Sequence, residues 1–366
     1  MTTAETQYFA LLRAALWDTP VAIEEQIDWK AVMGLAKYHA NDILLCDVAS
    51  KMAGSNKPSD EQLAKMKVAM RSNLFNHLQL KQILVSAVQQ LRQHGIEPVL
   101  LKGFGLALLY PNPNLRQFGD IDLFVGLDNF HQACALLRML PGGYNWGEEV
   151  DAGHHYNIEF GHYPMEIHRV SADVTDSKEA AVYACIEREG LVDNPQRVSL
   201  EDFPISIPSK EFVVFFTFYH AWLHFLTTGM GWRQISDVAL ALHNYYGQID
   251  LETLRRYLID MHLLEPWKTF GYLMVNCLGL SEAEMPFYNA SCRRKAQKLY
   301  CRIMEEGNFK REQKFKYKRP QRRLWRKFHA FICMFIDFFH IAKVFPGMAF
   351  RKMFSTLKFG IMKNLQ

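Results

Sequence analysis

Two aspartates, Asp120 and Asp122, are separated by a single residue and followed by the apolar run Leu123-Phe124-Val125. The run is typical of a strand, and strand side chains alternate between two faces, so we expect both carboxylates on the same face. Adjacent carboxylates repel each other, and one would keep its proton unless a cation lay between them. Carboxylate oxygens suit Mg²⁺, which binds one or two of them together with substrate phosphates. The pair therefore predicts a Mg²⁺ site, although two solvated carboxylates on a surface strand would give the same pattern.

A phosphate-binding turn is predicted upstream of the two aspartates. The apolar residues 98–101 predict a buried strand, which leads into Lys102-Gly103 and then into a helix over 106–110. Backbone N–H groups at the start of a helix bind anions, and the lysine beside them adds positive charge. Arg116 follows in the next loop as a second cationic side chain. We therefore expect Lys102, Gly103 and Arg116 to bind the phosphates of a substrate.

Downstream, two strands are predicted over 154–160 and 165–168, joined by a turn at 161–164. Glu166 and His168 share one face of the second strand. A third carboxylate on a neighbouring strand is what a two-metal phosphoryl-transfer site requires, so we expect Glu166 to lie within roughly 3–6 Å of the aspartate pair. His168 would orient Glu166 or contact the substrate, unless it is an ordinary hydrogen-bonded strand residue.

In this order, the motifs resemble the uncharacterised nucleotidyltransferases, a bacterial family of the superfamily whose catalytic core is similar to that of DNA polymerase β. The resemblance covers residues from about 98 to 245 and rests on Leu101-Lys102-Gly103, Tyr110-Pro111, Leu115-Arg116, Gly119-Asp120-Ile121-Asp122-Leu123, His154-His155 and Glu166-Ile167-His168, and more loosely on the stretch from Phe218 to Leu242. It implies that Asp120 and Asp122 are metal ligands. It also implies that Glu166 is the ligand of a second metal or the general base.

The resemblance further implies a reaction. Two Mg²⁺ ions, for which Mn²⁺ is an alternative, would assist transfer of a nucleoside monophosphate from an NTP to a hydroxyl or phosphate acceptor, with release of pyrophosphate. Lys102, Gly103 and Arg116 would bind the outer phosphates, and His168 would assist at the same site. The superfamily usually has Gly-Ser at this turn, whereas this chain has Lys102-Gly103, so the nucleotide would be held without that hydroxyl.

Two other functions stay open. A non-catalytic module could keep the fold and bind a nucleotide or a partner, and the missing serine favours it. Clustered carboxylates are costly to keep without a cation, which counts against it. A metal-dependent phosphohydrolase could use the same carboxylates. For a transferase, a saccharide or another small molecule is the favoured acceptor because the body of the chain is acidic, while a basic tail leaves nucleic acid open.

Several further polar residues receive structural interpretations. His154, His155, His162 and His168 lie close in sequence, as zinc ligands can. However, His154 and His155 are adjacent in a predicted strand and should point to opposite faces, so we do not expect them to share a metal. A second group, His220 and His224, is expected in the core or at an interface. Arg233 and Asp237 are expected to form an ion pair on a helix surface.

Hydrophobic periodicity predicts an α+β fold in which a small mixed-sheet core is flanked by helical regions. Helices are predicted around residues 8–16, 27–38 and 43–52, and a long one begins near Ser59 and ends at His94. Its apolar face is expected to include Met66, Met70, Leu74, Leu78, Leu84 and Leu91. We expect an N-terminal helical region over 1–96, the nucleotidyltransferase-like core over 97–208, a C-terminal helical domain over 209–309 and a tail over 310–366.

Composition favours a cytoplasmic protein with more than one core. Aromatic residues make up 13% of the 366 residues, which is ample for burial. The seven cysteines are scattered without a C-x-x-C pair, which argues against a disulfide framework or a zinc finger. The N-terminus lacks the basic and apolar segments of a secretory signal.

The tail from Lys310 to Gln366 is strongly basic. It contains 15 Lys and Arg residues against two acids, whereas the rest of the chain contains 27 basic and 36 acidic residues. Its aromatic stretch from Phe328 to Phe339 is too short and interrupted to span a bilayer. We expect a helix that packs its aromatic face on the protein's own core, or one that associates peripherally with an anionic membrane or an acidic partner.

Overall fold

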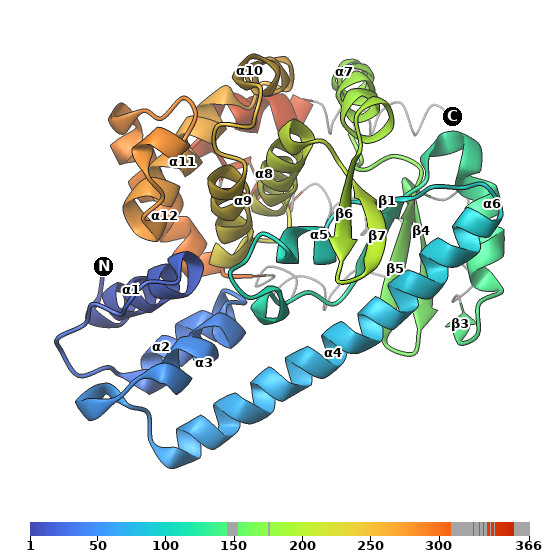
Figure 1. The fold of residues 1–366 in the computed structure, drawn as a ribbon. Helices are drawn as coiled ribbons and strands as arrows, with labels where there is room; N and C mark the ends of the chain where they lie inside the picture. The colour runs from blue at the N-terminus through green and yellow to red at the C-terminus, as the bar shows by residue number, and fades with distance from the viewer. Residues whose placement is uncertain are drawn as a thin grey trace.

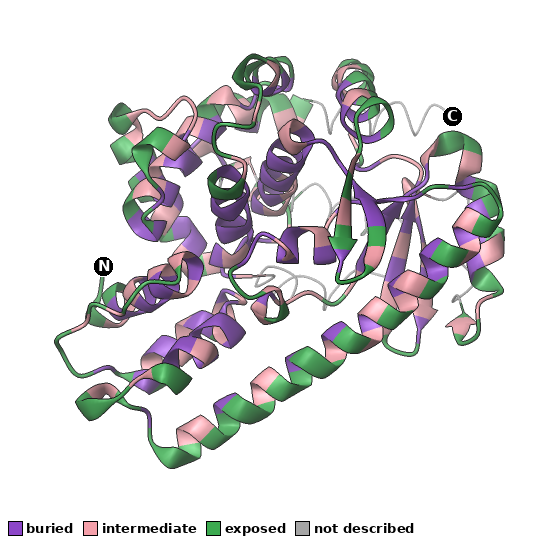
Figure 2. Cartoon of the chain, viewed as in Figure 1, coloured by how far each residue is buried: buried purple, intermediate pink, exposed green. Residues whose placement is uncertain are grey.

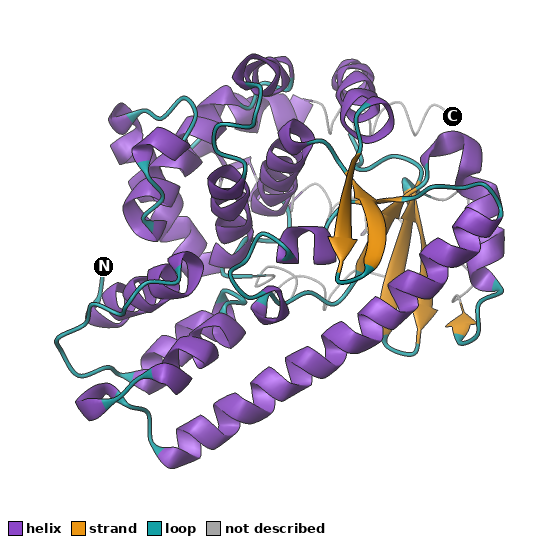
Figure 3. Ribbon diagram, viewed as in Figure 1, coloured by secondary structure: helices purple, strands orange, loops and turns teal. Residues whose placement is uncertain are grey.

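The computed structural model describes residues 1–144, 153–174, 176–308, 325, 329, 332, 335–336, 338–339 and 341–354. A seven-stranded mixed sheet lies between helices, as the α+β prediction requires (Figures 1 and 3). The helices are α1 (Thr3–Trp17), α2 (Trp29–Tyr38), α3 (Asp42–Lys51), α4 (Asp60–Gln93), α5 (Phe104–Ala107), α6 (Gly126–Arg138), α7 (Ser177–Glu187), α8 (Lys210–Leu226), α9 (Trp232–Asn244), α10 (Leu251–Asp260), α11 (Leu264–Leu278) and α12 (Arg293–Glu306).

The sheet has the order β3-β4-β5-β2-β1-β7-β6. Its strands are β1 (Val99–Leu100), β2 (Ile121–Phe124), β3 (Gly143–Tyr144), β4 (His155–Phe160), β5 (Tyr163–His168), β6 (Gln196–Leu200) and β7 (Phe203–Ile207). β2 pairs with β5 in parallel and β1 pairs with β7 in parallel, while the other neighbours are antiparallel. The strands predicted from the motifs are therefore present as β1, β2, β4 and β5.

One face of the sheet is apolar and packs against α4 and α6. Ile121 and Leu123 of β2 and Ile167 of β5 belong to a buried cluster that includes Leu84 and Leu91 of α4. Because strand side chains alternate, the residues between them point to the opposite face. That opposite face carries Asp122 and Glu166. The hydrophobic pattern of β2 and β5 thus fixes the direction of the polar side chains.

The helices from the two ends of the chain share a second apolar core. The Phe9 ring of α1 meets the Trp232 ring of α9 edge to face, with the centroids 4.7 Å apart. Trp17 of α1 donates from Nε1 to the backbone oxygen of Leu278 at the end of α11. α8 and α9 are buried over most of their length (Figure 2). The N-terminal helical region is therefore joined to the C-terminal helices by side-chain packing.

The long helix α4 begins as predicted but does not bury the whole predicted face. Ser59 and Gln62 form a reciprocal capping box at its start. Met66, Leu84 and Leu91 are buried, as expected. Leu74 and Leu78 are exposed, because the middle of α4 projects past the sheet without a neighbouring layer on that side (Figure 2). The apolar positions therefore predicted the helix correctly, but these two of them do not belong to the core.

The described part of the tail is both packed and exposed. Ile341 and Phe345 are fully buried, and the Phe345 ring meets Trp222 of α8 at 5.3 Å between centroids. Phe339 and Phe354 are exposed instead. Most of the predicted tail, including 309–324 and 355–366, lies outside the described residues. None of the described helices is long and apolar enough to cross a membrane.

Candidate active site

Two of the three carboxylates predicted to act together, Asp122 and Glu166, meet on the polar face of the sheet. Asp122 of β2 lies directly opposite Glu166 of β5 in the parallel register. Asp122, Glu166 and His168 each offer one ligand atom, and these atoms lie within 4.8 Å of one another. Asp120 immediately precedes β2, and its charge interacts with those of Asp122 and Glu166. Strand pairing has therefore brought a third acid and a histidine to the aspartate motif.

Two basic side chains neutralise part of this charge. Lys102 Nζ lies 2.9 Å from Oδ1 of Asp122, and His168 Nε2 lies 3.2 Å from the same oxygen and 3.3 Å from Oε2 of Glu166. Burial alone would lower the pKa of His168, but its bonds to the two carboxylates raise that pKa above the ordinary value. Burial opposes ionisation of Asp122, yet Lys102 and His168 hold its pKa well below the ordinary value.

Asp122 is partly compensated by protein groups without a metal. Clustered carboxylates were expected to be costly without a metal, but Lys102 and His168 already compensate Asp122. Asp120 differs from Asp122, because burial and repulsion from Asp122 raise its pKa above the ordinary value. In addition, Oδ2 of Asp122 is buried without a hydrogen-bond partner among the described residues. An unpartnered buried carboxylate oxygen beside further acids fits a divalent cation.

The turn at Gly103 contacts a buried ion pair between Arg116 and Asp237. Gly103 has φ +60° and ψ −114°, a conformation that side chains other than glycine rarely adopt. Arg116 donates from Nη1 to the backbone oxygen of Gly103 at 3.1 Å. It also pairs with the Asp237 carboxylate, at 2.7 Å from Nε and 2.9 Å from Nη2. Tyr110 donates to the same carboxylate. Arg116 is buried in this network, and its contact with the backbone oxygen of Gly103 positions the turn.

Two expectations about this region were wrong. Asp237 is buried and pairs with Arg116, so it is not half of an ion pair on a helix surface. Arg233 instead donates to the backbone oxygen of Gln117. The helix after Gly103 contains only four residues, Phe104–Ala107, so it starts earlier than the predicted helix over 106–110 and overlaps it only at Leu106 and Ala107. Such a short helix has little dipole, so anion binding there would depend on Lys102 and the backbone of the turn.

The geometry above agrees with a comparison of the sequence with known families. The pattern of the uncharacterised nucleotidyltransferases matches residues 25–279. The chain belongs to this family. The match extends well beyond the motifs around the carboxylates, since it begins before α2 and ends just after α11. A search of curated proteins found no match.

The histidines of this nucleotidyltransferase family member are arranged differently from the prediction. His154 precedes β4 and therefore does not follow the alternation of the strand. Its Nε2 lies 2.9 Å from Nδ1 of His155, so the two rings meet and do not point to opposite faces. Burial lowers the pKa of His154 to about 4 and also lowers that of His155.

His220 of α8 is a site residue that the sequence did not identify. Its Nε2 lies 3.4 Å from Nζ of Lys102, and burial, together with the Lys102 charge, keeps its pKa well below the ordinary value. The two residues are 118 positions apart, and the aromatic residues around His220 predicted a position in the core or at an interface. The contact between His220 and Lys102 depends on how α8 packs against the sheet, so the sequence alone did not predict it.

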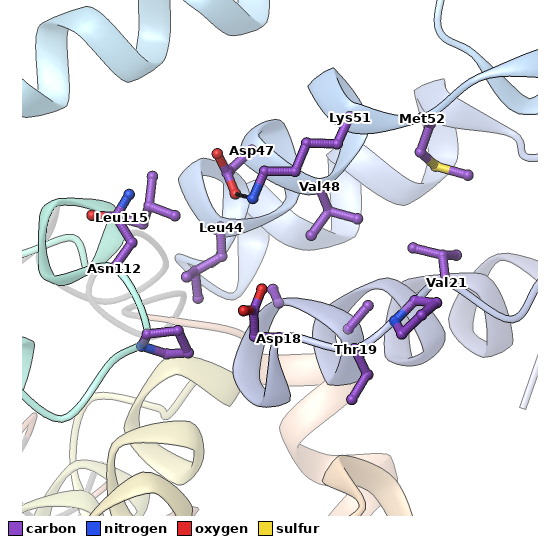
Figure 4. Close-up of a pocket in the computed structure, with 14 residues that line it drawn as sticks. Asp18, Thr19, Val21, Leu44, Asp47, Val48, Lys51, Met52, Asn112 and Leu115 are labelled. Carbon is purple, nitrogen blue, oxygen red and sulfur yellow. Dashed lines mark ion pairs between the residues drawn. The ribbon is translucent and has the colours of Figure 1, made fainter.

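A separate pocket of about 640 Å³ lies between α1, α3 and the loop that precedes Arg116 (Figure 4). Apolar side chains such as Val48 and Leu115 line it, with Asp18 and the Asp47–Lys51 ion pair at 2.7 Å as polar groups. None of the predicted site residues lines it. No sequence motif had marked this pocket, because its walls come from three separate segments.

Proposed function

We propose that this family member transfers a nucleoside monophosphate from an NTP to a hydroxyl or phosphate acceptor. An acceptor oxygen would form a bond to the α-phosphorus of the NTP while the bond from that phosphorus to the bridging oxygen breaks. The bonding electrons would leave with pyrophosphate, and the acceptor proton would pass to Glu166. The observation that carries this proposal is the in-register pairing of Asp122 and Glu166 beside Asp120.

Asp120, Asp122 and Glu166 would hold the catalytic Mg²⁺, or Mn²⁺, and the unpartnered Oδ2 of Asp122 supports this assignment. When bound, divalent cations neutralise the triphosphate and stabilise the charge that develops on the leaving group. Family membership supports nucleotidyl transfer in general, and the metal, the nucleotide and the acceptor are our proposal.

The chain's own residues would divide the remaining work. Glu166 suits the role of base because its side chain is 27% exposed, whereas Asp122 is fully buried. Burial raises the pKa of Glu166, but other interactions, chiefly the hydrogen bond to His168, hold that pKa below the ordinary value. Glu166 is therefore ionised near pH 7. His168 thereby keeps the base deprotonated and oriented. Lys102 would bind a phosphate oxygen of the NTP as a point charge.

The acidic body favours a saccharide or another small molecule as the acceptor over nucleic acid. We further propose that the tail binds an anionic membrane surface. Its described part exposes Ile332 by 42%, Phe339 by 60%, Phe350 by 50% and Phe354 by 63%. Exposed apolar side chains within a segment of net charge +13 match the properties of interfacial anchors.

The enzymatic proposal is tested by incubating the protein with each NTP and Mg²⁺, with and without a panel of sugars and sugar phosphates. Pyrophosphate release that depends on one acceptor would support it. Release of inorganic phosphate would favour a phosphohydrolase. Nucleotide binding without any turnover across the panel would favour the non-catalytic module.

A further inference from the structure

The last residue of β5 and the first residue of β4 are both histidines, and they lie opposite each other. His155 pairs with His168 in the antiparallel register. His154 is held next to them because its backbone oxygen accepts a hydrogen bond from the N–H of Arg169. Three imidazoles therefore converge at one corner of the sheet, beside the carboxylates but formed by different residues, with only His168 common to both groups.

The rings are close enough to bind one ion. The ring centroids are 4.3 Å apart for His154 and His155, 5.2 Å for His155 and His168, and 5.9 Å for His154 and His168. One nitrogen from each ring lies within 4.8 Å of the other two. Zn²⁺ binds imidazole nitrogen at roughly 2.0–2.1 Å, so small side-chain rotations would let the three nitrogens bind one ion.

The ligand chemistry distinguishes this group from the carboxylates. Imidazole nitrogen suits Zn²⁺ and its transition-metal neighbours, whereas Mg²⁺ prefers oxygen. Nδ1 of His168 is buried and has no hydrogen-bond partner among the described residues. Such a nitrogen is costly to bury unless something occupies it.

We propose that His154, His155 and His168 form a binding site for a single Zn²⁺ ion. Three imidazole ligands leave one position open, as in catalytic zinc sites, and Glu166 is a further acid beside them, with its Oε1 3.9 Å from Nε2 of His155. The site would thus add a transition-metal ion to the edge of the carboxylate cluster. It does not depend on the nucleotidyl transfer proposed above.

The test uses the full-length chain, stripped of metal with a chelator and then equilibrated with Zn²⁺ or Co²⁺ in excess Mg²⁺. We expect one Zn²⁺ per chain to remain after buffer exchange, and a Co²⁺ absorption spectrum with nitrogen ligation. His154→Ala and His155→Ala should each weaken Zn²⁺ binding by at least about 100-fold. Loss of a residue that only hydrogen-bonds to a metal ligand already costs about 10–100-fold. His162→Ala is the matched control, because His162 is an exposed histidine in the turn between the same strands.

Two results would overturn the site. One is Zn²⁺ affinity that is unchanged in His154→Ala and His155→Ala while both variants melt like the wild type. The other is Zn²⁺ binding that is lost in Glu166→Gln but kept in the histidine variants, which would place the ion on the carboxylates. Neither result depends on pyrophosphate release, so failure of this proposal is distinguishable from failure of the transferase proposal.

Discussion

Asp122 and Glu166 occupy directly opposite positions on the parallel strands β2 and β5. Because opposite residues in neighbouring strands point to the same face, this register alone determines that the two carboxylates meet. A shift of one residue would send Glu166 into the apolar cluster under α4 and α6, and bring Met165 or Ile167 beside Asp122. The register is protected against that shift by the buried apolar residues on the other face.

Replacing Asp122 with Asn should abolish metal-dependent activity and also destabilise the protein without metal. Repulsion from Asp120 suggested from the sequence that losing this charge could stabilise the fold. However, Asp122 pairs with Lys102 and His168, so the variant removes the carboxylate paired with the buried Lys102 and one of the two partners of His168, at a cost of up to about 3–5 kcal/mol. Thermal unfolding with and without Mg²⁺ and NTP measures both effects, since the wild type alone should be stabilised by ligand.

Asp128→Asn serves as the control for that variant, because Asp128 is an exposed acid on α6. Its stability should change by less than about 0.5 kcal/mol. An Asp122→Asn protein that is stabilised by Mg²⁺ and NTP as strongly as the wild type would remove Asp122 from the site.

Asp237→Ala should cost about 3–5 kcal/mol of unfolding free energy, because it leaves the buried Arg116 guanidinium without its counter-ion. Denaturant titration measures the change. Glu189→Gln removes half of another close ion pair, with Arg256, but both side chains of that pair are more than a third exposed. That control should cost less than about 1 kcal/mol. Equal losses in the two variants would contradict a structural role for the Arg116–Asp237 pair.

His39 should make the protein less stable in mild acid. Its ring is fully buried, neither nitrogen has a hydrogen-bond partner within the described part of the chain, and burial lowers its pKa from 6.5 to about 4. In the unfolded chain His39 therefore becomes protonated below about pH 6.5, whereas in the folded chain it stays neutral down to about pH 4. Unfolding free energy should fall across this window by up to about 3 kcal/mol from this residue.

The measurement is denaturant unfolding at pH 7 and pH 4.5 for the wild type and for His39→Leu, which should lose less stability on acidification. His162→Leu, at an exposed histidine, should keep the full dependence of the wild type. If His39→Leu shows the same decline as the wild type, other groups cause the acid sensitivity.

The tail should bind vesicles of anionic lipid and not vesicles of neutral lipid, and added salt should weaken this binding. Burying a Phe side chain contributes about 1.5–3 kcal/mol. Replacing Phe339 and Phe354 together with Ser should therefore weaken co-sedimentation at least about tenfold. Phe75→Ser is the control, since Phe75 is an exposed aromatic residue on α4. Equal weakening by the control, or unchanged binding of the double variant, would argue against the tail as the membrane contact.

Local sequence determined the elements of the core well. The capping box at Ser59 and Gln62 gives the start of α4, and the apolar run after Asp120 gives β2. These features depend on neighbours within about four residues, so the sequence contains all the necessary information. The family motifs were readable for the same reason, because each is a short segment.

Only the tertiary structure decided which segments meet. Arg116 and Asp237 are 121 positions apart, and Lys102 and His220 are 118 apart, so no local pattern pairs them. Apolar periodicity likewise showed which side chains of α4 could be buried, but not that Leu74 and Leu78 would lack a covering layer. Burial and ion pairing are properties of the packed chain, because they depend on which distant groups replace water around each side chain.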